Sequence, residues 1–202
     1  MKKIISVLLI ICMALFGMTA CTKKEDSNNE SQKTSAKDKY TAQIVVKDYG
    51  TITLELDAKT APITVENFVN LAKSGFYDGL TFHRIMANFM IQGGDPEGTG
   101  SGGSPNKIKG EFRNNGVENN ISHKRGVISM ARRSGDNNSA SSQFFICHAD
   151  STFLDGDYAA FGYVTDGIEV VDKICETVVP VDNNGTVPKE NQPVIEKVII
   201  VD

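Results

Sequence analysis

Apolar and polar residues alternate strictly over residues 51–57, the second half of a segment that begins at Ile44. Ile52, Leu54 and Leu56 are separated by polar side chains and follow a turn-forming Gly50. A period of two is typical of a β-strand with one buried face, and glycine between two such runs favours a tight turn. The pattern predicts an antiparallel hairpin over this segment, with one face in a core.

A helical period replaces this alternation further along the chain. Thr64 is a suitable N-cap, Glu66 places a negative charge in the first turn, and Gly75 suits the end of a helix. The apolar residues of this segment share one helical face: Val65, Phe68, Val69 and Ala72. A second helix is predicted from Ile168 to Cys175 on the same grounds.

Short runs of β-forming residues make up most of the remaining pattern. They are separated by Gly, Asn and Asp, and they cover residues 81–85, 89–92, 126–130, 144–147, 159–164 and 194–201. Many strands with two helices fit a closed antiparallel barrel, which leaves no exposed sheet edge. The sequence therefore predicts a mostly β domain that carries two α-helices.

The N-terminus has the pattern of an export signal. Lys2 and Lys3 precede an apolar run that is too short for a spanning helix and that ends in small residues before Cys21. A retained transmembrane helix is the weaker interpretation. Residues 1–20 are predicted to be a signal peptide, and residues 21–39, which are almost entirely polar, a flexible spacer. Residues 40–202 are long enough for one domain with a sizeable core.

Charge and cysteine usage narrow the possible partners. Removal of Lys2 and Lys3 leaves 19 basic against 25 acidic residues, a net charge of −6, which disfavours nucleic acid as a partner. Within the domain, Cys147 and Cys175 both lie in apolar runs. Two buried thiols are favoured over one disulfide, although the sequence leaves the pairing open.

One segment combines a single cation with large apolar side chains. Residues 82–95 hold Arg84 and Gln92 on either side of Asn88, a residue type that tolerates left-handed backbone. A turn there would place the two polar side chains opposite each other on paired strands. Residues 142–146 supply a second apolar cluster. Together they predict an apolar pocket that contains one fixed cation.

These two segments, with Phe153-Leu154-Asp155-Gly156 and Phe161-Gly162, resemble the cyclophilin family of peptidyl-prolyl cis/trans isomerases. The resemblance runs from about Tyr40 to the C-terminus. It implies a closed eight-stranded antiparallel barrel capped by two α-helices, and it implies isomerisation of X–Pro bonds without a cofactor or a metal.

The resemblance also assigns site residues. It implies catalytic roles for Arg84, Phe89 and Gln92, and it implies substrate binding by Met90, Ala131, Arg132, Gln143, Phe145, Phe153, Leu154 and Tyr158. A guanidinium suits this chemistry because it stays protonated and offers several donors in a fixed plane. The alternative for Arg84 is an ion pair with an acid such as Asp95 or Glu111.

Three positions depart from the best-known eukaryotic pattern. Phe153 stands where many members have a tryptophan that donates a hydrogen bond to cyclosporin, so we expect weak cyclosporin binding. Tyr158 falls where histidine is common, and it keeps an aromatic ring with a polar tip. The loop 131–141 opens with Ala131-Arg132, which is similar to bacterial members, and the correspondence is insecure beyond Arg132.

Met18-Thr19-Ala20-Cys21 resembles the bacterial lipobox, in which the cysteine becomes lipidated. We therefore expect a monomeric protein anchored to the bacterial cell membrane through Cys21, outside the cytoplasm, acting on proline-containing segments of exported proteins. An ordinary secreted protein is the alternative. The sequence leaves two other functions as alternatives: a binding module without turnover, and a solute-binding lipoprotein, for which the domain is too short.

The segment Gly98-Thr99-Gly100-Ser101-Gly102-Gly103 has the spacing of a dinucleotide fingerprint. Pro105 and a polar run follow it where a helix should begin, so nucleotide binding is disfavoured. A loop at the rim of the pocket is the preferred interpretation. The three histidines, His83, His123 and His148, show no metal-binding spacing.

Overall fold

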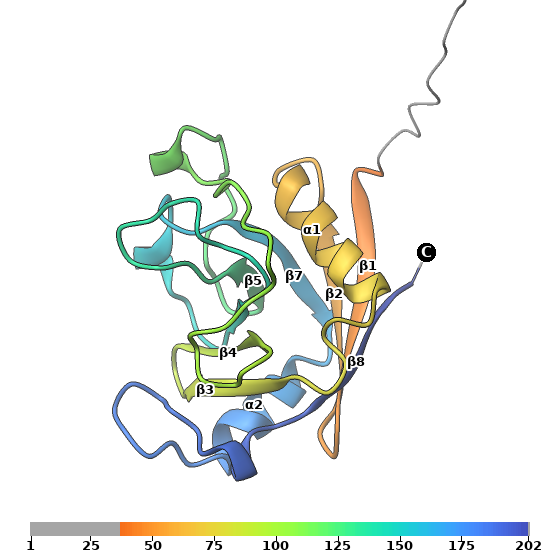
Figure 1. Ribbon diagram of the computed structural model, residues 1–202, viewed down its shortest axis with the longest axis vertical. Coiled ribbons are helices and arrows are strands. Elements are labelled where there is room, and N and C mark those ends of the chain that lie inside the picture. Colours follow the sequence, from red (N-terminus) through yellow and green to blue (C-terminus); the bar gives the residue numbers. More distant parts are fainter. Residues whose placement is uncertain (1–36, 202) are drawn as a thin grey trace, which may run out of the picture. The chain divides into compact units, whose positions relative to one another are not determined.

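The computed structural model describes residues 37–201, which form eight β-strands and two α-helices (Figure 1). The strands are β1 (Lys39–Val46), β2 (Gly50–Asp57), β3 (Thr81–Met86), β4 (Met90–Asp95), β5 (Val127–Met130), β6 (Phe144–Cys147), β7 (Ala160–Asp166) and β8 (Ile195–Ile200). The helices are α1 (Pro62–Lys73) and α2 (Ile168–Thr177).

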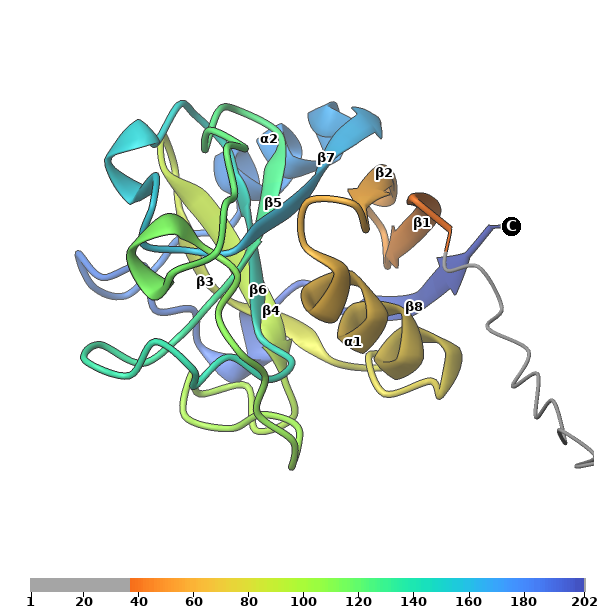
Figure 2. The ribbon, with the colours of Figure 1, turned by 90° about the horizontal axis from the view of Figure 1, so that it is seen from above.

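All eight strands belong to one antiparallel sheet with the order β3-β4-β6-β5-β7-β2-β1-β8. The sheet curls until its edge strands approach each other, as Figure 2 shows from above. They meet over a short stretch, where the Phe82 amide donates to the Pro193 carbonyl at 3.0 Å and the Ile195 amide donates to the Leu80 carbonyl at 2.7 Å. The mostly β fold with two helices is thus confirmed, and the barrel closes through these few backbone bonds.

The two helices cover opposite ends of the curled sheet (Figures 1 and 2). Helix α1 packs against β8 and β2, and α2 packs against β2 and β3. Phe68 of α1 meets the rings of Tyr77, Phe144 and Phe161 at centroid distances between 5.1 and 5.6 Å. Burial of such rings stabilises the fold through the apolar area that they remove from water.

The N-terminal hairpin confirms the alternation in the sequence. Ile52, Leu54 and Leu56 are fully buried, and Gly50 adopts a φ of 129°, which disfavours side chains. Strand β1 begins at Lys39, one residue before the predicted start of the domain, because Lys39 pairs with β2 and bonds its side chain to a glutamate there.

Helix α1 begins earlier than the sequence predicted, and the predicted cap is wrong. Ala61 is the N-cap, Pro62 opens the helix, and Thr64 lies inside it. The carboxylate of Glu111 accepts bonds from the backbone amides of Ile63 at 3.1 Å and Thr64 at 2.7 Å, and from the Thr64 hydroxyl. A buried acid distant in sequence therefore satisfies the free amides that a local cap would otherwise take.

The predicted signal peptide, the lipidation of Cys21 and most of the spacer lie outside the described residues. Within residues 37–201, no helix combines the length and the apolar character that crossing a membrane requires. Cys147 and Cys175 are both free thiols, Cys147 buried and Cys175 partly buried, as favoured from the sequence.

Candidate active site

The hairpin of β3 and β4 positions the predicted cation. Arg84 and Gln92 are directly paired across the two strands, and the turn between them passes through Asn88 with a φ of 63°. The Nη1 group of Arg84 donates to the Gln92 side-chain carbonyl at 3.3 Å. The predicted turn and the predicted pairing of these two residues are both confirmed.

Arg84 is half-buried, and every described group that it contacts is uncharged. Its Nε donates to the Asn184 backbone carbonyl at 2.7 Å, and its Nη2 donates to the Asn184 side chain at 3.2 Å. The guanidinium also lies 5.9 Å from the centre of the Phe89 ring. Burial lowers the pKa of Arg84 from its ordinary value, yet a guanidinium remains protonated in proteins.

The alternative partners suggested for Arg84 have other roles. The Asp95 carboxylate accepts four backbone amide bonds, from Glu97, Thr99, Gly100 and Gly102, so it organises the glycine-rich loop. Burial raises the pKa of Asp95, but these four bonds outweigh burial and hold it below its usual value. Glu111 caps α1, as described above. The cation of Arg84 therefore remains available to a ligand.

Two glutamine side chains connect the cation to the glycine-rich loop. Gln92 uses its oxygen to accept from Arg84 and its nitrogen to donate to the Gln143 oxygen at 2.9 Å. The nitrogen of Gln143 then donates to the carbonyls of Gly100 at 3.0 Å and Gly102 at 2.7 Å. Because arginine can only donate, the orientation of both amides follows from this chain.

An apolar cavity of about 120 Å³ lies beside Arg84. Its floor is formed by side chains from β4 and β6 and from the segment after β6: Met90 and Phe145 are nearly inaccessible, and Leu154 is buried. Its wall residues are Arg84, Phe89, Met90, Gln92, Ala131, Arg132, Phe145, Leu154 and Tyr158. Nine of the eleven predicted site residues therefore share one cavity.

The remaining two predicted residues lie outside this wall. Gln143 lies behind Gln92, on the side of the glycine-rich loop. Phe153 is 72% exposed and stands at the rim, with its ring 5.5 Å from the Phe89 ring. Sequence reasoning did not identify Asn184, because a turn residue one hundred positions from Arg84 carries no local signal of that contact.

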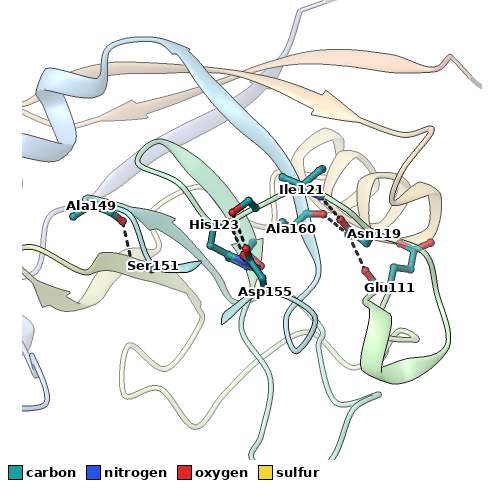
Figure 3. Close-up of polar contacts among 10 residues, drawn as sticks. Glu111, Asn119, Ile121, His123, Ala149, Ser151, Asp155 and Ala160 are labelled. Carbon is teal, nitrogen blue, oxygen red and sulfur yellow. Dashed lines mark hydrogen bonds and ion pairs between the residues drawn. The ribbon is translucent and has the colours of Figure 1, made fainter. Parts of the chain in front are cut away.

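A polar network lies behind the Phe145 wall of the cavity, and Figure 3 shows its contact between His123 and Asp155. His123 stacks on Phe145 with a ring-to-ring distance of 6.0 Å. Its Nδ1 lies 2.8 Å from an Asp155 carboxylate oxygen, and its Nε2 lies 3.0 Å from the Ser129 hydroxyl. His123 and Ser129 are completely buried, so their side chains cannot reach a substrate, and the His123 ring, held at both nitrogens, supports the Phe145 ring.

A polar cavity of about 280 Å³ adjoins the apolar one, and the two share Gln92, Ala131 and Arg132. The glycine-rich loop forms one side of it, as the sequence indicated when it placed this segment at the pocket rim. No α-helix follows the loop until α2 in the described chain, so the segment lacks the strand-turn-helix context of a dinucleotide site.

The fold is thus a curled antiparallel sheet with a cleft in which Arg84 lies beside apolar walls without an acid as its partner among the described residues. Residues 41–201 match the sequence family described as cyclophilin type peptidyl-prolyl cis-trans isomerase/CLD. A peptidyl-prolyl cis-trans isomerase of Helicobacter pylori is 49% identical over 137 residues, which cover 66% of this chain and 80% of the relative.

Other comparisons agree. Peptidyl-prolyl cis-trans isomerase B of Bacillus subtilis is 41% identical over 150 residues, covering 74% of this chain and 95% of that protein. A crystal structure of a Cryptosporidium parvum cyclophilin type isomerase, determined in the presence of the dipeptide Ala-Pro, has a TM-score of 0.70 and 31% identity. The match covers 80% of this chain and 99% of that one. The chain belongs to the cyclophilin type peptidyl-prolyl cis/trans isomerase family and is an enzyme of that activity.

Proposed function

We propose that this isomerase binds a proline ring in the apolar cavity and uses Arg84 to stabilise the twisted state of the preceding peptide bond. The single observation that carries the proposal is the position of the guanidinium, unpaired with any acid in the described chain, at the edge of that cavity. The Ala-Pro dipeptide named with the C. parvum relative supports a proline-containing ligand here.

The chemistry requires no bond to break. An X–Pro bond rotates slowly because resonance gives it partial double-bond character and a barrier of about 18–20 kcal/mol. In the twisted state that resonance is lost, and the prolyl nitrogen has a localised lone pair. A donor aimed at this atom stabilises the twisted state more than either planar state, which is the condition for catalysis.

The residues around Arg84 position its guanidinium and keep water away from the proline ring. Asn184 and Gln92 hold the guanidinium, so that little reorganisation is needed as rotation proceeds. Phe89, Met90, Phe145 and Leu154 exclude water and surround the ring, while Gln143 orients Gln92. Each reduction of the barrier by about 1.4 kcal/mol accelerates rotation roughly tenfold, so one charge-assisted bond in a dry site supplies several decades.

A protease-coupled assay on a proline peptide, with the affinity for the same peptide measured in parallel, tests this role. Arg84→Ala should lower kcat/KM by about a hundredfold or more and weaken peptide binding far less. Arg113→Ala, which removes an exposed arginine away from the cavity, should match the wild type. Equal rates for wild type and Arg84→Ala would remove Arg84 from the mechanism.

The alternative is a binding module that holds proline segments as a chaperone or adhesin with no useful turnover. The same assay separates the two functions. Peptide binding without acceleration by the wild type would favour the binding module. The intact hydrogen-bond chain from Arg84 to the glycine-rich loop supports the enzyme.

We also propose that the enzyme works outside the cytoplasm, anchored to the bacterial cell membrane through a lipidated Cys21, on exported proteins with slowly isomerising prolines. The proposal rests on the sequence of residues 1–21. Two or three acyl chains hold a protein firmly, whereas one holds it only marginally. Mass spectrometry of the mature N-terminus should find a diacylglycerol-modified Cys21, and an unmodified N-terminus upstream of it would refute the anchor.

We also propose that the protein acts as a monomer and that it binds cyclosporin weakly. The second of these proposals is supported by the exposed Phe153 ring at the rim, which has no hydrogen-bond donor.

A further inference from the structure

The polar cavity next to the proline site, here called the second cavity, has walls from two loops. Residues 100–105 of the glycine-rich loop form one wall, and residues of the loop 131–141 form the other. Its volume of about 280 Å³ exceeds the 120 Å³ of the apolar cavity. The second cavity is therefore large enough for a side chain. The shared wall of Gln92, Ala131 and Arg132 makes the two cavities neighbours along one surface.

The second cavity is lined by three cations and by no acid among its described lining residues. The cations are Lys107, Arg132 and Arg133. This local excess of positive charge contrasts with the net charge of −4 of the whole chain. A fold that concentrates cations around a hollow creates a local potential that attracts anions.

The three cations differ in how far the protein already uses them. The Arg132 side chain already has partners within the protein. Its Nε donates to the Asp157 carbonyl at 2.8 Å, and its guanidinium lies 4.8 Å from the centre of the Tyr158 ring. Lys107 has only a long contact of 3.6 Å with Asp136. The Arg133 side chain has no hydrogen bond or ion pair within residues 37–201. Arg133 and Lys107 are therefore the cations that a ligand can engage.

The polar groups on the other side of the second cavity are already satisfied. Asp95 anchors the glycine-rich loop through four backbone amides, and Gln143 binds two of its carbonyls. The Ser139 hydroxyl accepts from the Arg133 amide at 2.8 Å, which fixes the backbone that carries the free guanidinium. The hollow is thus held open by the fold, and a ligand need not order it.

From this arrangement we infer that the second cavity binds an acidic side chain of the peptide substrate, and that Arg133 and Lys107 give the isomerase a preference for carboxylate-bearing segments near the proline. The inference rests on the proposed binding of proline in the apolar cavity. A guanidinium matches a carboxylate in charge and in its planar, two-point geometry.

The position of the acidic residue follows from the spacing of an extended chain. Successive residues advance about 3.3 Å, and neighbouring side chains point to opposite sides. The two cavities share wall residues, so an acidic residue two positions from the proline, with its side chain on the same side of the chain, can enter the second cavity. Because the wall alone does not fix the chain direction, both sides of the proline belong in the test.

The test compares peptides that differ only in Glu, Gln or Lys at each of these positions. The full chain is used, and rotation is measured by NMR exchange spectroscopy, because a coupling protease would itself respond to the peptide charge. We expect the Glu peptide to be preferred over the Gln peptide by about threefold at low salt, the effect of one partly exposed ion pair. High salt should reduce this preference.

Two pairs of substitutions test whether Arg133 and Lys107 cause the preference for the Glu peptide. Arg133→Gln with Lys107→Gln should abolish the discrimination between Glu and Gln while leaving the rate on the Gln peptide unchanged. Lys59→Gln with Lys197→Gln removes the same charge from exposed positions outside the second cavity and should keep the preference. Equal rates on Glu and Gln peptides, or a preference that survives the first pair of substitutions, would overturn the inference. Failure to isomerise any peptide would instead refute the proposed function.

Discussion

At the scale of single residues, the site depends on the direction in which each amide side chain points. Arg84 offers only donors, so Gln92 must present its oxygen to it and its nitrogen to Gln143. Replacement of either glutamine by glutamate would remove the bond that its side-chain nitrogen donates, because a carboxylate can only accept. The sequence identified these residue types, but the order of their bonds depends on the loop carbonyls of Gly100 and Gly102.

Phe153 stands at the rim of the apolar cavity, where its ring contacts Phe89. Its ring is exposed and stands against Phe89, so a larger ring with a donor would fit without repacking. Phe153→Trp should strengthen cyclosporin binding about fivefold, because one neutral hydrogen bond contributes about 1 kcal/mol. Calorimetry of both forms measures this, with Phe153→Leu as a control that lacks a donor. Equal affinities for all three would refute the explanation.

At the scale of elements, the start of α1 shows where local patterns fail. Thr64 and Glu66 have the residue types of a helix start, yet the helix opens at Pro62 and its free amides are satisfied by Glu111. The partner comes from a loop some 47 residues away, and no local rule can identify it. Strand positions were predicted well because alternation and flanking glycines are local properties, as in the Gly50 hairpin.

Glu111 should therefore contribute to stability without contributing to catalysis. Glu111→Gln keeps the shape but places an amide where the carboxylate accepted bonds, so the free energy of unfolding should fall by about 1–2 kcal/mol, the range for a lost helix cap. Urea unfolding of the folded domain measures it. Glu196→Gln, on an exposed position of β8, is the matched control and should change little. Equal stability of the two variants would contradict the cap.

The turn between β3 and β4 is held by a histidine from the end of β6. The Asn88 amide donates to His148 Nδ1 at 2.8 Å, and the Nε2 of His148 lies 3.2 Å from Asp172. The His148 amide also donates to the Phe89 carbonyl at 2.9 Å. The ring thus accepts at one nitrogen and donates at the other, and it supports the left-handed residue next to the Phe89 wall.

His148→Ala should lower kcat/KM about tenfold, because small displacements of site residues are costly. His148→Asn should retain most of the activity, since its side-chain oxygen can accept from the Asn88 amide as Nδ1 does. Hydrogen exchange of the Asn88 amide gives an independent readout and should be fast only in the alanine variant. If both variants lose activity equally while that amide stays protected, His148 does not position the turn.

At the scale of the whole molecule, the fold class and the cavity were accessible from the sequence, whereas the contacts that close the barrel were not. The pairing of Arg84 with Gln92 follows from one turn at Asn88. The contact of Arg84 with Asn184 depends on how a late loop returns to β3, which is a property of the complete sheet. Long-range contacts of this kind carry no periodic signal.

The buried histidines make stability depend on pH. Burial lowers the pKa of His83 and of His123, and it outweighs the opposing effect of Asp95 and of Asp155 respectively. In the unfolded chain these histidines bind protons near their ordinary pKa of about 6.5. In the folded protein they bind protons only at a lower pH. Stability is therefore complete above about pH 6.5 and declines as the pH falls below it.

Urea unfolding at pH 7.5 and pH 5.5 should show a lower free energy of unfolding at the lower pH. His83→Gln removes one of the two groups and should reduce that difference, because glutamine does not titrate. His83 suits this test because it is 4% exposed and neither ring nitrogen has a hydrogen-bond partner in the described residues. An unchanged pH dependence in the variant would exclude His83 as a cause.

The most direct test of the account is the rate of rotation on the enzyme itself, measured by NMR exchange with a proline peptide at saturating enzyme. This rate excludes binding, so it reports the barrier alone. We predict that Arg84→Ala slows rotation on the enzyme by about a hundredfold or more, while Arg84→Lys, which keeps the charge but not the planar fork, gives an intermediate rate. Rotation on Arg84→Ala as fast as on the wild type would contradict the claim that this guanidinium stabilises the twisted peptide bond.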